Sequence, residues 1–114
     1  MESCIFCEII KGNIPCNKVY EDDQILAFDD IHPMAPVHVL VIPKVHIQTL
    51  MDMSVEHADI LLALGKSVQL IARKKSVAES GFRVVINCNE EGGQVVQHLH
   101  IHILGGVRLK DELG

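Results

Sequence analysis

Three histidines alternate with aliphatic residues in the stretch His98–Leu104, which reads HLHIHIL. An alternation of apolar and polar residues with a period of two predicts a β-strand that is buried on one face. Glycine pairs at positions 92–93 and 105–106 bound the stretch and can begin and end a strand. We therefore expect a strand with one aliphatic face and one imidazole face.

The spacing limits what the three imidazole rings can do together. At about 3.3 Å per residue, the backbones of His98 and His102 lie roughly 13 Å apart, with His100 midway. A zinc ion binds imidazole nitrogens at about 2 Å, so one ion could bind two neighbours but hardly all three. Neutral imidazole is also a nucleophile near neutral pH. Two chemistries stay open: neighbouring histidines hold a catalytic zinc, or His100 attacks phosphorus and forms a covalent phosphohistidine.

The remaining pattern predicts an α+β fold, with an antiparallel sheet of about five strands, one short helix and one long helix. Apolar residues at helical spacing predict the helices, and Ser54 is a candidate N-cap of the long one. Residues 37–42 are nearly all apolar, which favours a central strand covered on both faces. The expected helices are residues 4–11 and 54–78, and the expected strands are residues 19–21, 25–28, 37–42, 82–87 and the histidine stretch.

Composition bounds the class of protein. The chain has 114 residues, of which 48% are hydrophobic and 22% charged, and its formal net charge is -5. These values predict one compact domain over residues 1–114. The acidic balance argues against a nucleic-acid partner, because such modules usually carry a basic face. Neither a membrane span nor a signal-peptide pattern is present, so we expect a cytoplasmic protein without a membrane partner.

The histidine stretch resembles the signature of the histidine-triad (HIT) superfamily of nucleotide hydrolases and transferases. The flanking Gly93-Gln94 and Gly105-Gly106 resemble its Hint branch. Six further segments match Hint proteins in order along the chain: Ile14-Pro15, Glu21-Asp22-Asp23, Ala27-Phe28, Asp30-Ile31, Ala35-Pro36 and Val41-Ile42-Pro43-Lys44. The resemblance implies a single HIT domain that acts as a purine nucleoside phosphoramidase on substrates such as AMP-NH2, AMP-lysine or aminoacyl-AMP.

The resemblance also implies roles for individual residues. His100 is the expected nucleophile and carries the nucleotidyl group, while His102 binds phosphate or the ester oxygen and His98 orients its neighbour. Asp30 accepts the ribose hydroxyls. Phosphate donors are expected from Asn87 and from the backbone N–H groups of Gly93, Gln94 and Val95, and walls of the base slot from Phe6, Ile9, Phe28 and Ile31. Many Hint proteins have serine where this chain has Val95, so its leaving-group preference or rate should differ.

A metal site and a dimer are implied as well. Cys4 and Cys7 form a CxxC that, with His46 and His98, would complete a Cys2His2 set resembling the zinc site of some HIT proteins and of galactose-1-phosphate uridylyltransferases. Such a closed site is structural, and the chemistry requires no cofactor. Hint proteins pair through the long helix and a strand, so we expect a homodimer. The other cysteines, Cys16 and Cys88, are interpreted as small buried or partly buried residues, and the histidines His32, His38 and His57 as incidental.

Three other functions remain open at this point. A dinucleoside polyphosphate hydrolase would use the same histidines on a different substrate. A purine-nucleotide-binding regulatory protein with vestigial catalysis would bind purine nucleotides with negligible hydrolysis, and only Val95 suggests this function. A zinc metallohydrolase centred on His98 and His100 would lose activity reversibly on chelation and form no covalent adduct.

Overall fold

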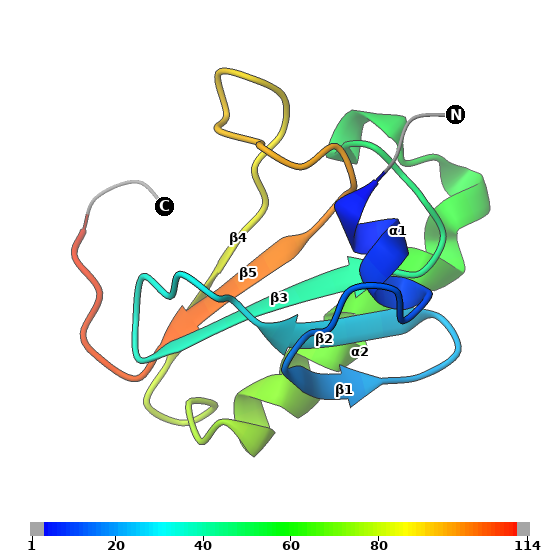
Figure 1. The fold of residues 1–114 in the computed structure, drawn as a ribbon. Coiled ribbons are helices and arrows are strands. Elements are labelled where there is room, and N and C mark those ends of the chain that lie inside the picture. Colours follow the sequence, from blue (N-terminus) through cyan, green and yellow to red (C-terminus); the bar gives the residue numbers. More distant parts are fainter. Residues whose placement is uncertain (1–3, 112–114) are drawn as a thin grey trace.

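The computed structural model describes residues 4–111 and contains a five-stranded antiparallel sheet with a helix on each face (Figure 1). The outermost three residues at each end of the expected domain, 1–114, lie outside this range. The predicted α+β fold, with five strands, one short helix and one long helix, is confirmed. Its elements are α1 (Ile5–Ile10), β1 (Lys18–Glu21), β2 (Ile25–Asp29), β3 (Val37–Pro43), α2 (Ala58–Lys74), β4 (Phe82–Val85) and β5 (Ile101–Gly105), and the strand order is β1-β2-β3-β5-β4.

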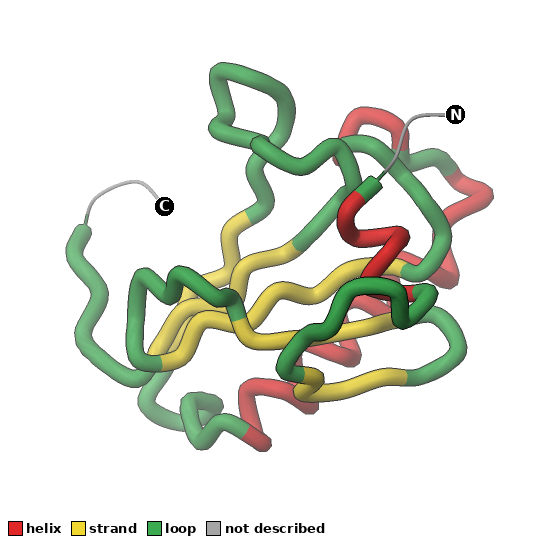
Figure 2. Tube along the Cα trace, in the orientation of Figure 1, coloured by secondary structure: helices red, strands yellow, loops and turns green. Residues whose placement is uncertain are grey.

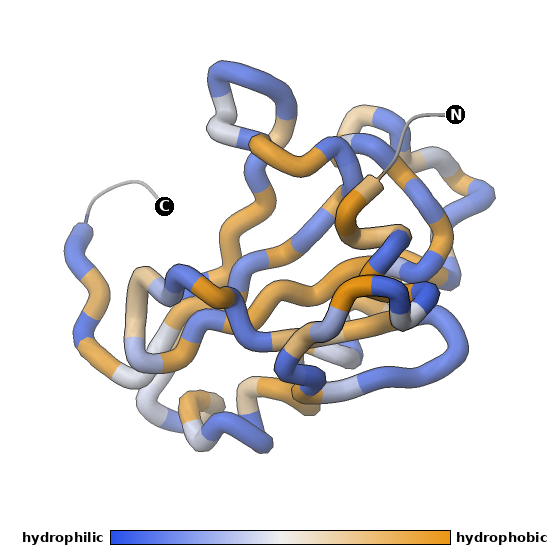
Figure 3. Tube along the Cα trace, viewed as in Figure 1, coloured by the Kyte–Doolittle hydropathy of each residue, from blue (hydrophilic) through white to orange (hydrophobic). Residues whose placement is uncertain are grey.

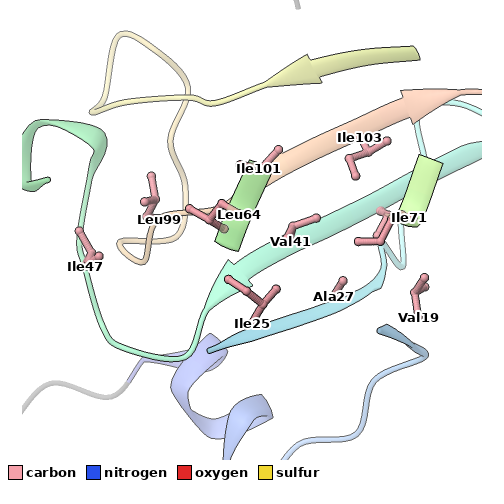
Figure 4. Packing of buried hydrophobic residues seen from close by; sticks show 11 residues of the cluster. Val19, Ile25, Ala27, Val41, Ile47, Leu64, Ile71, Leu99, Ile101 and Ile103 are labelled. Carbon is pink, nitrogen blue, oxygen red and sulfur yellow. The ribbon is translucent and has the colours of Figure 1, made fainter. Parts of the chain in front are cut away.

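The central strands bury both of their faces, because successive side chains point to opposite sides of the sheet. On the α2 side, the packed residues are Val19, Ile25, Ala27, Val39, Val41, Ile47, Leu64, Ile71, Leu99, Ile101 and Ile103 (Figure 4). On the α1 side, they are Phe6, Leu26, Phe28, Leu40 and Ile42. The strand predicted at residues 37–42 is therefore central and covered on both faces, as expected.

The long helix is shorter at both ends than its sequence pattern predicts. Two 3-10 turns, Leu50–Asp52 and Val55–His57, precede it, so Ser54 lies before a 3-10 turn and the α-helix begins at Ala58. The helix ends at Lys74, because Ser76 adopts a left-handed backbone with φ 61°. Glycine usually occupies such a position, and the expected end near residue 78 was wrong because serine gives no comparable signal.

The histidine stretch is only partly a strand. β5 begins at Ile101, and His98 and His100 lie on the loop segment that leads into it (Figure 2). Continuing the ladder with β3 would bring Leu99 opposite Pro43, which has no N–H to donate. The N–H of Leu99 instead donates to the carbonyl oxygen of Ile47 at 2.7 Å. The alternation of faces nevertheless persists, since Leu99 and Ile101 pack on the α2 side.

Hydropathy along the chain follows this arrangement. Figure 3 shows hydrophobic residues running along the central strands, with hydrophilic residues concentrated in the loops and at the ends of the chain segments shown. The longest helix within residues 4–111, α2, has 17 residues. No helix in the described range has the length and apolar character needed to cross a bilayer.

Candidate catalytic and metal sites

The three histidines of the stretch gather on the α1 side of the sheet. His98 and His100 are buried, with 0% and 7% of their surfaces exposed, and His102 is half-buried. The rings of His100 and His102 have centroids 5.1 Å apart. Phe6 of α1 packs edge-on against His98 at 5.8 Å and against His100 at 5.2 Å. Helix α1 thus fixes two of the three rings.

The backbone determines which nitrogen of His100 carries the proton. Its Nδ1 atom lies 2.7 Å from the carbonyl oxygen of His98. A carbonyl can only accept, so Nδ1 carries the proton and donates this bond. In the neutral ring, Nε2 then has the free lone pair. His100 therefore presents Nε2 as a nucleophile, held by a residue two positions earlier in the chain.

His102 belongs to a chain of hydrogen bonds that includes His38. The N–H of Met34 donates to Nδ1 of His38 at 3.0 Å, so His38 carries its proton on Nε2. This Nε2 lies 2.9 Å from Nδ1 of His102 and donates to it. His102 must then carry its own proton on Nε2, a buried atom that has no partner among residues 4–111. An anionic oxygen would satisfy this donor.

Burial keeps this histidine chain neutral. Burial, followed by the charges of His100 and His38, lowers the pKa of His102 to about 4. Burial also lowers the pKa of His38, against the opposing effect of Asp30. The interpretation of His38 as incidental was therefore wrong. A sequence signal existed, because a single polar residue in a strand covered on both faces must find a partner.

Asp30 lies beside His38 at the end of the β2–β3 ladder. Its Oδ1 accepts from the N–H of His32 at 2.8 Å, and its Oδ2 lies 3.4 Å from Nε2 of His38. Its own N–H donates to the carbonyl oxygen of His38 at 3.0 Å. The donor atoms of Asp30, His38 and His102 are close enough to hold a metal ion. The 2.9 Å contact already pairs the two imidazole atoms, so a hydrogen-bond chain accounts for this group.

The glycine-containing loop before the histidines offers fewer phosphate donors than expected. The N–H of Gly93 donates to Glu90 and the N–H of Gln94 donates to Asn89, both at 3.0 Å. The N–H of Val95 donates to no group among residues 4–111, and its side chain is 89% exposed. Two of the three N–H groups expected to donate to phosphate are therefore already paired within the loop. Asn87 is half-buried just after β4.

The residues expected to line a base slot differ in exposure. Phe6 and Phe28 are buried, with 6% and 5% exposed, and their ring centroids lie 5.7 Å apart. Ile9 is half-buried against the same cluster. Ile31 is 80% exposed. The first three thus belong to the core below α1, and Ile31 is the one of the four that presents most of its surface to solvent beside Asp30.

Four residues whose side chains can bind a metal ion converge where α1 meets the loops after β3 and before β5. Sγ of Cys4 lies 3.3 Å from Nδ1 of His98, and Sγ of Cys7 lies 3.3 Å from Nδ1 of His46 and 3.6 Å from Nδ1 of His98. The two Nδ1 atoms are 3.1 Å apart. Tetrahedral zinc would separate sulfur from nitrogen by about 3.5 Å and two nitrogens by about 3.3 Å. The four donor atoms therefore fit one tetrahedral ion.

Local structure prepares these ligands. Nε2 of His98 donates to the carbonyl oxygen of Pro43 at 2.8 Å, which leaves the Nδ1 lone pair facing the cysteines. Cys4 is the N-cap of α1 and accepts from the N–H of Cys7. Burial and Cys4 raise the pKa of the Cys7 thiol to about 11, and a bound cation would favour the thiolate instead.

A cavity of about 960 Å³ lies beside this cluster. Its lining residues are Cys4, Ile5, Cys7, Glu8, Lys11, Ile14, His46, Gln48, Val95, Val96 and Gln97. His100 and His102 are not among them. The cavity therefore borders three of the four residues of this cluster and the tip of the loop at Val95.

Comparisons with known proteins agree with this geometry. The family model of the HIT domain matches residues 11–109. The chain is 45% identical over 108 residues to the purine nucleoside phosphoramidase of Escherichia coli K12, covering 92% of this chain and 88% of that protein. It superposes on a HIT family hydrolase from Legionella pneumophila with a TM-score of 0.96 and 42% identity, covering 98% and 100% of the two chains. It also superposes on a histidine triad protein from Clostridium difficile with a TM-score of 0.93 and 47% identity, covering 99% of this chain and 100% of that chain.

Proposed function

This chain belongs to the HIT-domain family, and from that membership we propose that it hydrolyses purine nucleoside 5'-phosphoramidates through a covalent nucleotidyl-histidine. The similarity to the Escherichia coli phosphoramidase supports the substrate class. The observation that carries the proposal is the 2.7 Å bond from Nδ1 of His100 to the carbonyl oxygen of His98. It directs the lone pair of Nε2 away from the backbone, as attack on phosphorus requires.

The proposed reaction has two displacements at phosphorus. Nε2 of His100 attacks, the P–N bond breaks, and the departing amine takes a proton from solvent. Water then attacks the phosphohistidine, the N–P bond breaks, and the water loses a proton to solvent, which returns neutral His100 and AMP. His102 donates its Nε2–H to a phosphoryl or ester oxygen throughout, because its tautomer is fixed by His38.

The nucleotide itself would be recognised by residues around this pair. Asp30 accepts the ribose hydroxyls in this proposal, and the N–H of Val95 and the side chain of Asn87 donate to phosphate. Ile31, which is 80% exposed, contacts the base, while Phe6 and Phe28 support that surface from below. Ile9 contributes from α1.

Intact-mass analysis of wild-type protein and His100→Ala tests the proposal. After rapid acid quenching during turnover of AMP-NH2 or AMP-lysine, the wild type should carry one nucleotidyl group and His100→Ala none, with its turnover lost. Undiminished turnover by a folded His100→Ala variant would falsify the covalent mechanism. Comparing AMP-NH2 with diadenosine polyphosphates separates this function from that of a dinucleoside polyphosphate hydrolase.

Val95 favours a second candidate, a purine-nucleotide-binding protein with little turnover. Its side chain cannot donate a proton to a leaving amine, and it leaves only its backbone N–H for phosphate. This candidate predicts AMP binding by the wild type together with negligible hydrolysis of every phosphoramidate tested. Measurable turnover by the wild type that depends on His100 excludes it.

We further propose that Cys4, Cys7, His46 and His98 hold a structural zinc ion. A bound zinc ion would join the start of α1 to the loops after β3 and before β5, and it takes no part in the chemical steps. The carbonyl oxygen of the ligand His98 orients His100, so the ion would also restrict the nucleophile. Metal analysis with variants of Cys4 tests this assignment.

Exposed apolar residues on α2 and β4 support a homodimer. β4 is an edge strand of the described sheet, and a shallow groove of about 560 Å³ runs along α2. The exposed apolar side chains on these two elements are Leu61, Leu62, Leu70, Phe82 and Val84. An unpaired edge beside an apolar helix face suits a second copy of the same sheet, in which the two edges pair. We expect this dimer in the cytoplasm.

A further inference from the structure

Gln94 lies in the loop between β4 and β5, and only 6% of its surface is exposed. Its Oε1 accepts from the N–H of Asn89 at 2.9 Å. Its Nε2 donates to the carbonyl oxygen of Gln48 at 2.7 Å and to that of Val96 at 3.0 Å. An N–H can only donate and a carbonyl can only accept, so these three partners fix the orientation of the amide.

These bonds close the loop on itself. The N–H of Gln94 donates to the carbonyl oxygen of Asn89, so the two residues exchange a pair of hydrogen bonds. Asn89 itself is left-handed, with φ 62°. Gly92 approaches Cys88 so closely that a Cβ at position 92 would lie 2.3 Å from the carbonyl oxygen of Cys88. The side chain of Gln94 therefore completes a tight turn immediately before Val95.

The same amide attaches this loop to the segment after β3. The bond from Nε2 of Gln94 to Gln48 runs beside the bond from the N–H of Leu99 to Ile47. Both acceptors follow the metal-ligating residue His46 directly in sequence. Two ties thus hold the loop from both sides of Val95, and only the first depends on a side chain.

We propose that Gln94 is a positioning residue, whose buried amide holds the free backbone N–H of Val95 where it meets the transferring phosphate. The inference rests on the proposed phosphoramidase function. A donor for developing charge is effective when it is fixed in advance, because the transition state then requires no reorganisation. Gln94 does this through its side chain, while its own N–H is already used within the loop.

Gln94→Glu tests the proposal with little change of shape. At pH 8 the carboxylate would face two carbonyl oxygens that it cannot donate to, and kcat should fall by about tenfold to a hundredfold with a much smaller change in KM. At lower pH the carboxyl group introduced by Gln94→Glu becomes protonated and can again donate one hydrogen bond. The ratio of variant to wild-type kcat should therefore rise as the pH is lowered, whereas in Gln94→Met it should stay low at every pH. Gln24→Glu, an exposed glutamine in the turn between β1 and β2, is the matched control.

The amide resonance of Val95 separates this proposal from the proposed function. Adding AMP should shift that resonance in the wild type and in Gln24→Glu, and much less in Gln94→Met and in Gln94→Glu at pH 8. If the wild type hydrolyses no phosphoramidate, the proposed function fails, and the resonance still decides the role of Gln94. A folded Gln94→Met variant with wild-type kcat and a wild-type shift at Val95 overturns the inference.

Discussion

Nε2 of His38 on β3 lies 2.9 Å from Nδ1 of His102 on β5, although 64 positions separate the two residues. The strand register explains the contact. Leu40 is opposite His102 and Leu104 is opposite His38, so the two histidines are diagonal neighbours on one face of the sheet. Because the N–H of Met34 occupies Nδ1 of His38, the tautomer of His102 is determined from the backbone of a distant loop.

Replacing His38 by phenylalanine should impair catalysis while keeping the nucleophile. The ring volume is retained, but Nδ1 of His102 loses its donor, so the proton of His102 is no longer fixed on Nε2. We expect kcat to fall by about tenfold to a hundredfold with the covalent adduct still detectable. Steady-state kinetics and quenched intact mass measure this. His57→Gln, away from this chain of bonds, should retain the wild-type kcat, and an equal loss in both variants would refute the role of His38.

The stability of the fold should depend on pH through His102. Its pKa is lowered to about 4 by burial, from an ordinary value of 6.5, so the unfolded chain binds more protons between these values. The free energy of unfolding should therefore rise between about pH 4 and pH 6.5 and be level above that range, as far as His102 is concerned. The free energy of unfolding, measured with denaturant at several pH values, should rise less steeply with pH in His102→Gln than in the wild type. An equal rise of the unfolding free energy with pH in both proteins would exclude this contribution of His102.

The division of side chains between the two faces of the sheet was predictable from the sequence, because it depends on a period of two within each strand. The start of β5 was not predictable in this way. It depends on Pro43, which cannot donate to Leu99, and on Ile47, which accepts from Leu99 instead. Both residues lie far from the histidine stretch in sequence.

The contact between His38 and His102 escaped prediction for the same physical reason. Which residues of β3 face which residues of β5 is a matter of register, and neither strand specifies the register alone. The pairing of the N–H groups of Gly93 and Gln94 depends on a turn closed by a side-chain amide. The residues of the proposed metal site come from three separate segments of the chain, and before the structure only the family resemblance grouped them together.

Removing the metal should loosen α1. The proposed site would join Cys4 and Cys7 at the start of α1 to His46 and His98 through one ion, so purified protein should contain about one zinc per chain. Extraction with a strong chelator should lower Tm by about 10 °C or more, because the ion binds the folded chain only. Cys4→Ser should contain less zinc and show a smaller shift on chelation. Cys16→Ser, outside the cluster, is the matched control, and equal zinc contents in the two variants would contradict the assignment.

A charge on the exposed face of α2 should separate the proposed dimer. Leu62 is 60% exposed and borders the groove on this helix, so Leu62→Glu would place an unpaired carboxylate within an apolar contact. Light scattering after size-exclusion chromatography should give the mass of two chains for the wild type and of one chain for Leu62→Glu. Val45→Glu adds the same charge at a 46% exposed position of the loop after β3 and should remain dimeric. A monomeric wild type, or a dimeric Leu62→Glu variant at low micromolar concentration, would show that this face does not form the interface, because a buried unpaired charge at its centre would not be tolerated.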